Sequence, residues 1–250
     1  MSGTQSEVGY MARLVDLLEV LCDGAAASSY RQLAGRAGLP LSTTHRLAGL
    51  LLDKGLCDRT DDGRLVAGYR LLRLGLCSLD RLGDLRPAEE EVRTLSLLTG
   101  ESVSFGLVVG GRILLVARHE SDHVLRAVAK VGDVIAPHTS AMGKAIMAYL
   151  PSPQRSELMR KALGATGDKV LAELEPELEE VRRDGFARDE GQFAPGLRCR
   201  AAPVFGRSQR PVGAVSISGP ASRFSLADAQ SRVHDLKEAC SRLGKPWLDS

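Results

Sequence analysis

The sequence has few aromatic residues, 4% of its 250 positions, which argues against a protein that stacks single-stranded bases on aromatic rings. Its five cysteines are scattered and include no Cys-x-x-Cys pair, so neither a disulfide framework nor a zinc ribbon is indicated. No run approaches the roughly 18 apolar residues of a membrane span, and the N-terminus does not read as a signal peptide. We therefore expect a cytoplasmic protein that does not enter a membrane.

The net charge is also small, at +2. Any nucleic-acid binding must therefore use a local basic surface rather than the overall charge of the chain. One window supplies such a surface, because no acidic residue occurs between Asp23 and Asp53. A surface that contacts phosphates is typically free of carboxylates and supplied with arginine. The basic side chains that the window keeps are Arg31, Arg36 and Arg46, together with His45.

The same window has the pattern of a helix-turn-helix. Apolar residues at helical spacing predict a first helix over residues 10–22. Ser29, with Gln32 three residues later, is a capping-box signature for a second helix. Gly38 then provides a sharp turn before a third helix, which runs from about 40–42 to 54.

A hairpin and a linker are predicted to follow the third helix. Asp62-Gly63 is typical of a two-residue type I′ turn between short strands. Three helices and a hairpin make a winged helix-turn-helix. Residues 69–82 have a helical pattern again, and Gly83-Asp-Leu-Arg-Pro87 is the best domain boundary.

The third helix is the candidate DNA-binding element. Helical spacing places Thr44, Leu47 and Leu51 toward the core. Hydroxyls at a helix start can bond phosphates or base edges, and arginine can bond guanine in a forked geometry. The alternative is a solvated helix face, but the acid-free window, the capping box and the wing favour double-stranded DNA. The predicted outward residues are Ser42, Thr43, His45 and Arg46.

The second half of the chain has a different periodicity. A helix begins at Pro87, and Gly110-Gly111 is a hairpin signal between two strands. Strands are predicted at 103–109, 113–117, near 124–130, 197–205 and 212–218, and helices from 139–140, over 153–163 and 168–184, and from Ser225. Antiparallel strands with helices before, between and after them indicate an α+β domain.

Few residues of this domain indicate chemistry. Gly143-Lys144 lacks the first glycine and the Ser/Thr of a phosphate loop, although the helix opening could bind a carboxylate or be a simple N-terminus. Cys199 lies in an apolar strand, where a free cysteine usually packs as a small hydrophobe. Asp189 falls in a mixed-charge loop of the kind that is usually solvated. No catalytic, metal or cofactor motif is present.

Three further blocks resemble the IclR family of bacterial transcription regulators. They are LAGRAGLPLSTTHRLAGLLLDKG, PHTSAMGKAIMAYLP, and GLRCRAAPVF with AVSISGPASRFS. The resemblance covers about residues 8–245. It implies a winged-helix domain, a linker helix and a ligand-sensing domain with a GAF-like antiparallel sheet, in dimers that often pair into tetramers. Members often respond to organic acids or aromatic catabolites. The implied pocket residues are Ala141, Met142, Gly143, Asp189, Cys199, Ser216 and Ser218.

The chain departs from the family pattern at three places. Leu41 stands where members usually have a basic residue, and Gln192 where they often have glutamate. The wing reads Leu65-Val-Ala-Gly68 in place of the usual Tyr-x-Leu-Gly.

The sequence thus predicts a winged helix-turn-helix domain at 8–68, a linker helix at 69–83 and an effector-binding domain at 84–250. We expect a regulator, not an enzyme, without cofactor or metal. Its expected partners are operator DNA, a small-molecule effector and further copies of itself, as a homodimer or a dimer of dimers. The alternatives are a cysteine-dependent enzyme and a redox sensor, both using Cys199.

Overall fold

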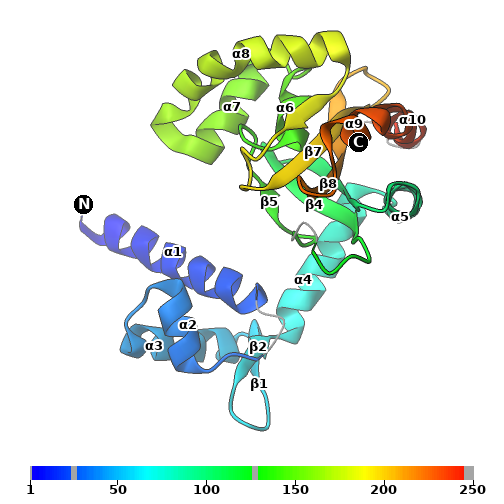
Figure 1. The fold of residues 1–250 in the computed structure, drawn as a ribbon. Helices are drawn as coiled ribbons and strands as arrows, with labels where there is room; N and C mark the ends of the chain where they lie inside the picture. Colours follow the sequence, from blue (N-terminus) through cyan, green and yellow to red (C-terminus); the bar gives the residue numbers. More distant parts are fainter. Residues whose placement is uncertain (1, 24–26, 126–128, 245–250) are drawn as a thin grey trace. The chain divides into compact units, whose positions relative to one another are not determined.

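The computed structural model describes the chain except residues 1, 24–26, 126–128 and 245–250. It divides into two compact units, Met1–Gly83 and Asp84–Ser250 (Figure 1).

The N-terminal unit is a three-helix bundle with a hairpin and a following helix. Its apolar core is formed by leucines of the three helices with Cys57 and Leu65 of the hairpin. Thr44, Leu47 and Leu51 are buried, as the helical spacing predicts. The elements are α1 (Ser2–Cys22), α2 (Tyr30–Ala37), α3 (Leu41–Asp53), β1 (Cys57–Arg59), β2 (Leu65–Ala67), α4 (Tyr69–Leu79) and the 3-10 turn η1 (Asp80–Leu82).

Local signals set the ends of α2. The Ser29 side chain accepts a hydrogen bond from the Gln32 N–H, and the Gln32 side chain accepts one from the Ser29 N–H at 2.8 Å. The predicted capping box is therefore confirmed. Gly38 ends the helix with φ 63°, a left-handed conformation that glycine adopts without a steric penalty.

The predicted type I′ turn at Asp62-Gly63 is wrong. The Thr60 N–H donates to the Arg64 carbonyl and the Gly63 N–H to the Thr60 carbonyl, so three residues form the loop. Gly63 has φ 79°, whereas Asp62 does not have the positive φ that a type I′ turn needs at both positions. The Thr60 hydroxyl bonds the Asp62 carboxylate at 2.5 Å, which stabilises the longer loop.

The C-terminal unit contains a six-stranded antiparallel sheet in the order β5-β4-β3-β8-β7-β6. Its strands are β3 (Ser102–Val109), β4 (Arg112–His119), β5 (Val134–Ile135), β6 (Ala187–Asp189), β7 (Leu197–Phe205) and β8 (Pro211–Pro220). Its helices are α5 (Arg86–Thr99), α6 (Ala141–Met147), α7 (Ser152–Leu163), α8 (Gly167–Asp184), α9 (Leu226–Ser231) and α10 (Val233–Leu243), with the 3-10 turn η2 (Gly164–Thr166).

Helices cover both faces of this sheet (Figure 1). On one face, α6 lies against β7 and β8, and α7 and α8 pack beyond it to complete an apolar core. On the other, α5 and α10 contact the central strands and each other. The sheet is therefore covered by helices on both sides.

Two predictions for this unit need correction. No strand is present at residues 124, 125, 129 and 130, and the rest of the strand predicted near 124–130 lies outside the described residues. The sequence pattern also does not predict the two short strands at the sheet edges, because β5 has two residues and the three residues of β6 carry mixed charge. By contrast Gly110 and Gly111, both with positive φ, join β3 to β4 as predicted.

Candidate functional site

The start of α3 presents polar side chains on an exposed surface. Ser42, His45 and Arg46 are exposed and Thr43 is partly exposed. The residue before the helix is Pro40, which gives no side-chain cap, so the first-turn N–H groups are not satisfied by a side chain. Free N–H groups at a helix N-terminus attract anions.

Aromatic residues hold the basic side chains of this surface. The His45 ring stacks on Tyr30 with centroids 4.0 Å apart, and Arg46 lies over the Tyr10 ring at 4.9 Å. Arg59 of β1 donates to the Tyr30 hydroxyl at 2.7 Å, which links the hairpin to α2. The sequence had not singled out these aromatic supports. Arg31 and Arg36 are exposed on α2.

A cavity lies between α6 and the sheet in the second unit. Six of the seven predicted pocket residues line it: Ala141, Met142, Asp189, Cys199, Ser216 and Ser218. The structure adds polar lining residues that the sequence did not indicate, namely Ser104, Arg118 and Ser140. The cavity volume is about 50 Å³.

Gly143, the seventh predicted residue, does not line this cavity. Its N–H donates to the Ser140 side chain at 3.0 Å, and a Cβ at this position would lie 2.3 Å from the Pro137 carbonyl oxygen. Glycine is therefore needed here because α6 approaches the preceding loop closely, and its contribution to the cavity is to position Ala141 and Met142.

Strand register explains how residues distant in sequence meet at the cavity. Ser218 pairs with Ser102 on one side and with Cys199 on the other, and Cys199 pairs with Asp189. Ser216 pairs with Ser104, and Ser104 with Arg118. The two paired sets are two residues apart along β3 and β8, so they face the same side of the sheet.

Arg118 reaches this face because β4 contains a β-bulge. Phe105 pairs with Ala117 and Gly106 with Leu115, which leaves Val116 as an extra residue in β4. Leu115 and Arg118 therefore point to the same face although they are three residues apart. Regular alternation would have placed Arg118 on the opposite face, and this is why the sequence pattern gave no sign of it.

Asp189 is fully buried at the end of β6. Its Oδ1 accepts backbone hydrogen bonds from Gly191, Gln192 and Phe193 at 3.0, 2.7 and 3.2 Å, which fixes the loop that carries Phe193 to the cavity. Its Oδ2 accepts no hydrogen bond among the described residues. The solvated loop expected from composition is therefore wrong at this position, because the carboxylate caps the loop from inside.

A buried lysine secures the same loop from α6. Lys144 is fully buried, and its Nζ donates to Glu177 Oε1 of α8 at 2.5 Å and to Gln192 Oε1. Gln192 is a departure from the family pattern, and its neutral side-chain amide accepts a hydrogen bond from this lysine. The cavity wall thus depends on contacts between α6, α8 and the loop after β6.

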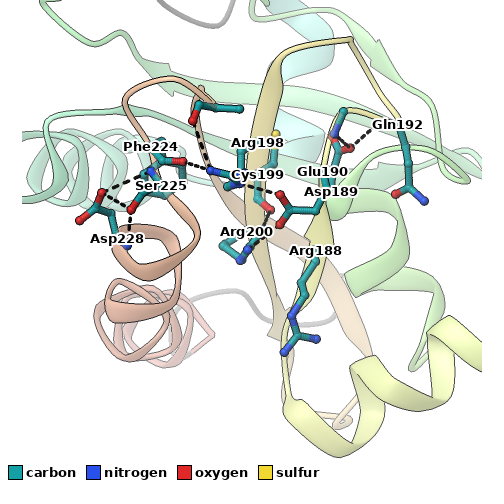
Figure 2. Close-up of polar contacts among 12 residues, drawn as sticks. Arg188, Asp189, Glu190, Gln192, Arg198, Cys199, Arg200, Phe224, Ser225 and Asp228 are labelled. Carbon is teal, nitrogen blue, oxygen red and sulfur yellow. Dashed lines mark hydrogen bonds and ion pairs between the residues drawn. The ribbon is translucent and has the colours of Figure 1, made fainter.

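The outer part of this region is held by ion pairs (Figure 2). Glu190 pairs with Arg198 at 2.6 Å and with Arg200 at 2.6 Å. Burial raises the pKa of the Glu190 carboxyl, but the hydrogen bonds from both arginines outweigh burial and hold that pKa below its usual range. Arg198 also donates to the Phe224 carbonyl, so the network joins β6, β7 and the start of α9.

Comparisons with known proteins identify the family of both units. The family model described as the IclR helix-turn-helix domain matches residues 11–60, and the model described as bacterial transcriptional regulator IclR C-terminal matches residues 78–244. The chain belongs to the IclR family. It is a bacterial transcriptional regulator with a helix-turn-helix DNA-binding domain and a C-terminal effector domain.

Individual relatives cover most of the chain. The transcriptional repressor IclR of Escherichia coli (strain K12) is 30% identical over 88% of this chain and 82% of that protein. The glycerol operon regulatory protein of Streptomyces coelicolor is 32% identical over 93% and 94%, respectively. An IclR homolog from Microbacterium hydrocarbonoxydans, solved in complex with 4-hydroxybenzoate, shares the fold with a TM-score of 0.71, at 21% identity over 94% of this chain and 97% of that one.

Cys199 is poorly suited to nucleophilic or redox chemistry. Burial, with the charge of Asp189 adding to it, raises the pKa of its thiol to about 12. The thiolate is the reactive form, and it is therefore rare at neutral pH. Among the described residues no group of three or more histidine, cysteine or acidic side chains is placed to hold a metal ion. The helices of the described residues are each too short or too polar to span a bilayer.

Cysteine alkylation should distinguish the reactive thiol of Cys77 from the unreactive thiol of Cys199. With iodoacetamide at pH 8, Cys77 is expected to react in the native protein because it is exposed, and Cys199 is expected to stay unmodified, with a thiolate fraction of about 10⁻⁴. Peptide mass spectrometry, with a urea-unfolded sample in which all five react as the control, measures this. Rapid native labelling of Cys199 would contradict the assignment and favour the cysteine-enzyme alternative.

Proposed function

We propose that this regulator binds a two-fold symmetric operator as a dimer, with α3 in the major groove, and that a small organic acid in the cavity of the second unit changes its affinity for DNA. The observation that carries the DNA-binding part is the acid-free surface at the start of α3. The names of relatives, which include a repressor, favour repression. We further propose that it acts in the bacterial cytoplasm, where the operator lies.

The proposed DNA contacts follow from the α3 geometry. The uncapped first turn and the side chains of Ser42 and Thr43 suit backbone phosphates. Arg46, supported by Tyr10, and His45, supported by Tyr30, extend from the next positions toward base edges or phosphates. Arg31 and Arg36 of α2 add phosphate contacts, while the exposed Leu41 contributes none.

Replacing Arg46 with alanine should weaken specific operator binding. If the guanidinium reads a base, the loss is roughly 1–3 kcal/mol, or about 10- to 100-fold in Kd. A mobility-shift titration on a duplex selected by the wild-type protein from a random pool measures it. Arg207→Ala, which removes an exposed arginine from the β7–β8 turn in the other unit, is the matched control. Unchanged affinity in Arg46→Ala would remove this residue from the interface.

The exposed surface of α4 supports a second copy of the chain as its partner. This helix has no buried residue, and it exposes large apolar side chains at Tyr69, Leu72, Leu76 and Leu79. Their 3-4-3 spacing is the a/d repeat of a coiled-coil seam, which a matching helix covers. One copy also has few cations at α3, so a dimer that presents the surface twice fits a symmetric operator.

Charge placed in this seam should disrupt assembly. Leu76→Glu is expected to shift the protein toward monomer in sedimentation equilibrium and to weaken operator binding by at least tenfold, because a buried carboxylate without a partner is costly. Leu74→Glu introduces the same charge on the opposite side of the same helix and should leave the oligomer intact. Dimers of equal stability in both variants would rule out the α4 seam.

The effector part of the proposal rests on the cavity between α6 and the sheet. Ala141 and Met142 of α6 close it from one side, and Cys199, Ser216 and Ser218 line the strand side. The Ser216 and Ser218 hydroxyls lie 3.4 Å apart and offer donors to a small polar molecule. The Microbacterium relative, solved with 4-hydroxybenzoate, supports an organic acid as the ligand class. The effect on DNA binding is bounded by the effector's differential affinity for the two states.

A thermal-shift screen of small carboxylic acids should find a stabilising ligand, because binding to the folded state raises the melting temperature by mass action. Ser216→Ala should raise the Kd of that ligand by about 2- to 10-fold, the usual cost of one hydrogen bond. Ser241→Ala, on the exposed side of α10, should leave the Kd unchanged. Equal Kd values in both variants would place the ligand elsewhere.

A further inference from the structure

Arg118 places a positive charge inside the proposed effector cavity. Its side chain is 5% exposed, and its Nη1 donates to the Ser104 hydroxyl at 2.7 Å. Glu120 Oε1 lies 3.8 Å from its Nε, and the Glu120 side chain is 46% exposed. Of the described residues that line the cavity, Arg118 is the one with a cationic side chain.

The β4 bulge is what brings this guanidinium to the cavity. Val116, the extra residue, turns Arg118 to the face shared with Leu115 and Ser104, both of which line the cavity. Bulges commonly re-aim a side chain next to a binding site. A guanidinium offers donors in a planar fork that matches a carboxylate, and the low polarity of a buried site strengthens such a pair.

We infer that Arg118, with Ser104, binds the carboxylate of the effector. This inference rests on the proposed effector cavity and narrows its ligand class. Asp189 lies at the other side of the cavity, on β6, with β3, β8 and β7 between it and the β4 strand of Arg118, and its Oδ2 accepts no hydrogen bond among the described residues. A second carboxylate there would meet this buried charge. The cavity therefore selects a monocarboxylate with a hydrogen-bond donor, such as a hydroxyl, at its far end.

The test compares acids with their neutral amides on full-length protein. Titration calorimetry is run with two probe pairs: 4-hydroxybenzoate with 4-hydroxybenzamide, and lactate with lactamide. In the wild type the acid of at least one pair should bind at least tenfold more tightly than its amide. In Arg118→Met this ratio should fall close to one. In Arg118→Lys, which keeps the charge but loses the fork, it should be intermediate. Terephthalate, with a second carboxylate, should bind more weakly than 4-hydroxybenzoate.

Arg112→Met is the matched control, because it removes an exposed arginine from the same strand outside the cavity. It should preserve the acid-to-amide ratio. A purely structural role for Arg118 would change the melting temperature without changing this ratio. If Arg118→Met does not fold, the ratio in Arg118→Lys decides.

The outcomes separate this inference from the proposed function. If the wild type prefers the acid and Arg118→Met keeps that preference, the Arg118 assignment is wrong and the organic-acid effector stands. If the wild type binds amides as tightly as acids, the cavity binds ligand but not through a carboxylate. If none of the probes and no acid of the screen binds, both proposals are overturned.

Discussion

The register of the antiparallel sheet is the constraint on which the effector site depends. The polar side chains on the strand side of the cavity, together with Cys199, owe their positions to pairing across β4, β3, β8, β7 and β6. A slip of one residue in any pair would exchange the cavity face for the face that packs on α5 and α10. Those two helices therefore act on the cavity indirectly, because burial of the opposite face fixes the register.

Local sequence signals predict most helices and the long strands, because the contacts that define them lie within a few residues. Ser29 with Gln32 starts α2 through contacts within one helical turn, and the burial of Thr44 and Leu47 follows from helical period alone. Gly110-Gly111 defines its hairpin for the same reason. The resemblance to a known family, rather than spacing, is what had brought Asp189, Cys199 and the two serines together as pocket candidates.

Features set by tertiary contacts, by a side-chain contact in a loop or by a backbone irregularity could not be predicted from local sequence patterns. The mixed-charge composition around Asp189 predicts a solvated residue. Asp189 is buried because it pairs with Cys199 in the sheet and caps the loop that follows it. The position of Arg118 at the cavity could not be predicted because one inserted residue in β4 breaks the two-residue period of the strand. The loop at Asp62 differs from the expected turn because the Thr60 hydroxyl donates a hydrogen bond to the Asp62 carboxylate and stabilises a three-residue loop. In each case a non-local or side-chain contact overrides a local pattern.

The apolar stripe on α4 has a consequence for the amount of protein that a cell must keep. Under the proposed dimer, a chain that loses its partner uncovers Tyr69, Leu72, Leu76 and Leu79 to water. The stability of the linker helix and the occupancy of the operator then both vary with the concentration of the chain. At a low copy number the linker helix would be less stable and fewer operators would be occupied. The abundance of the protein would then regulate its activity in addition to the effector.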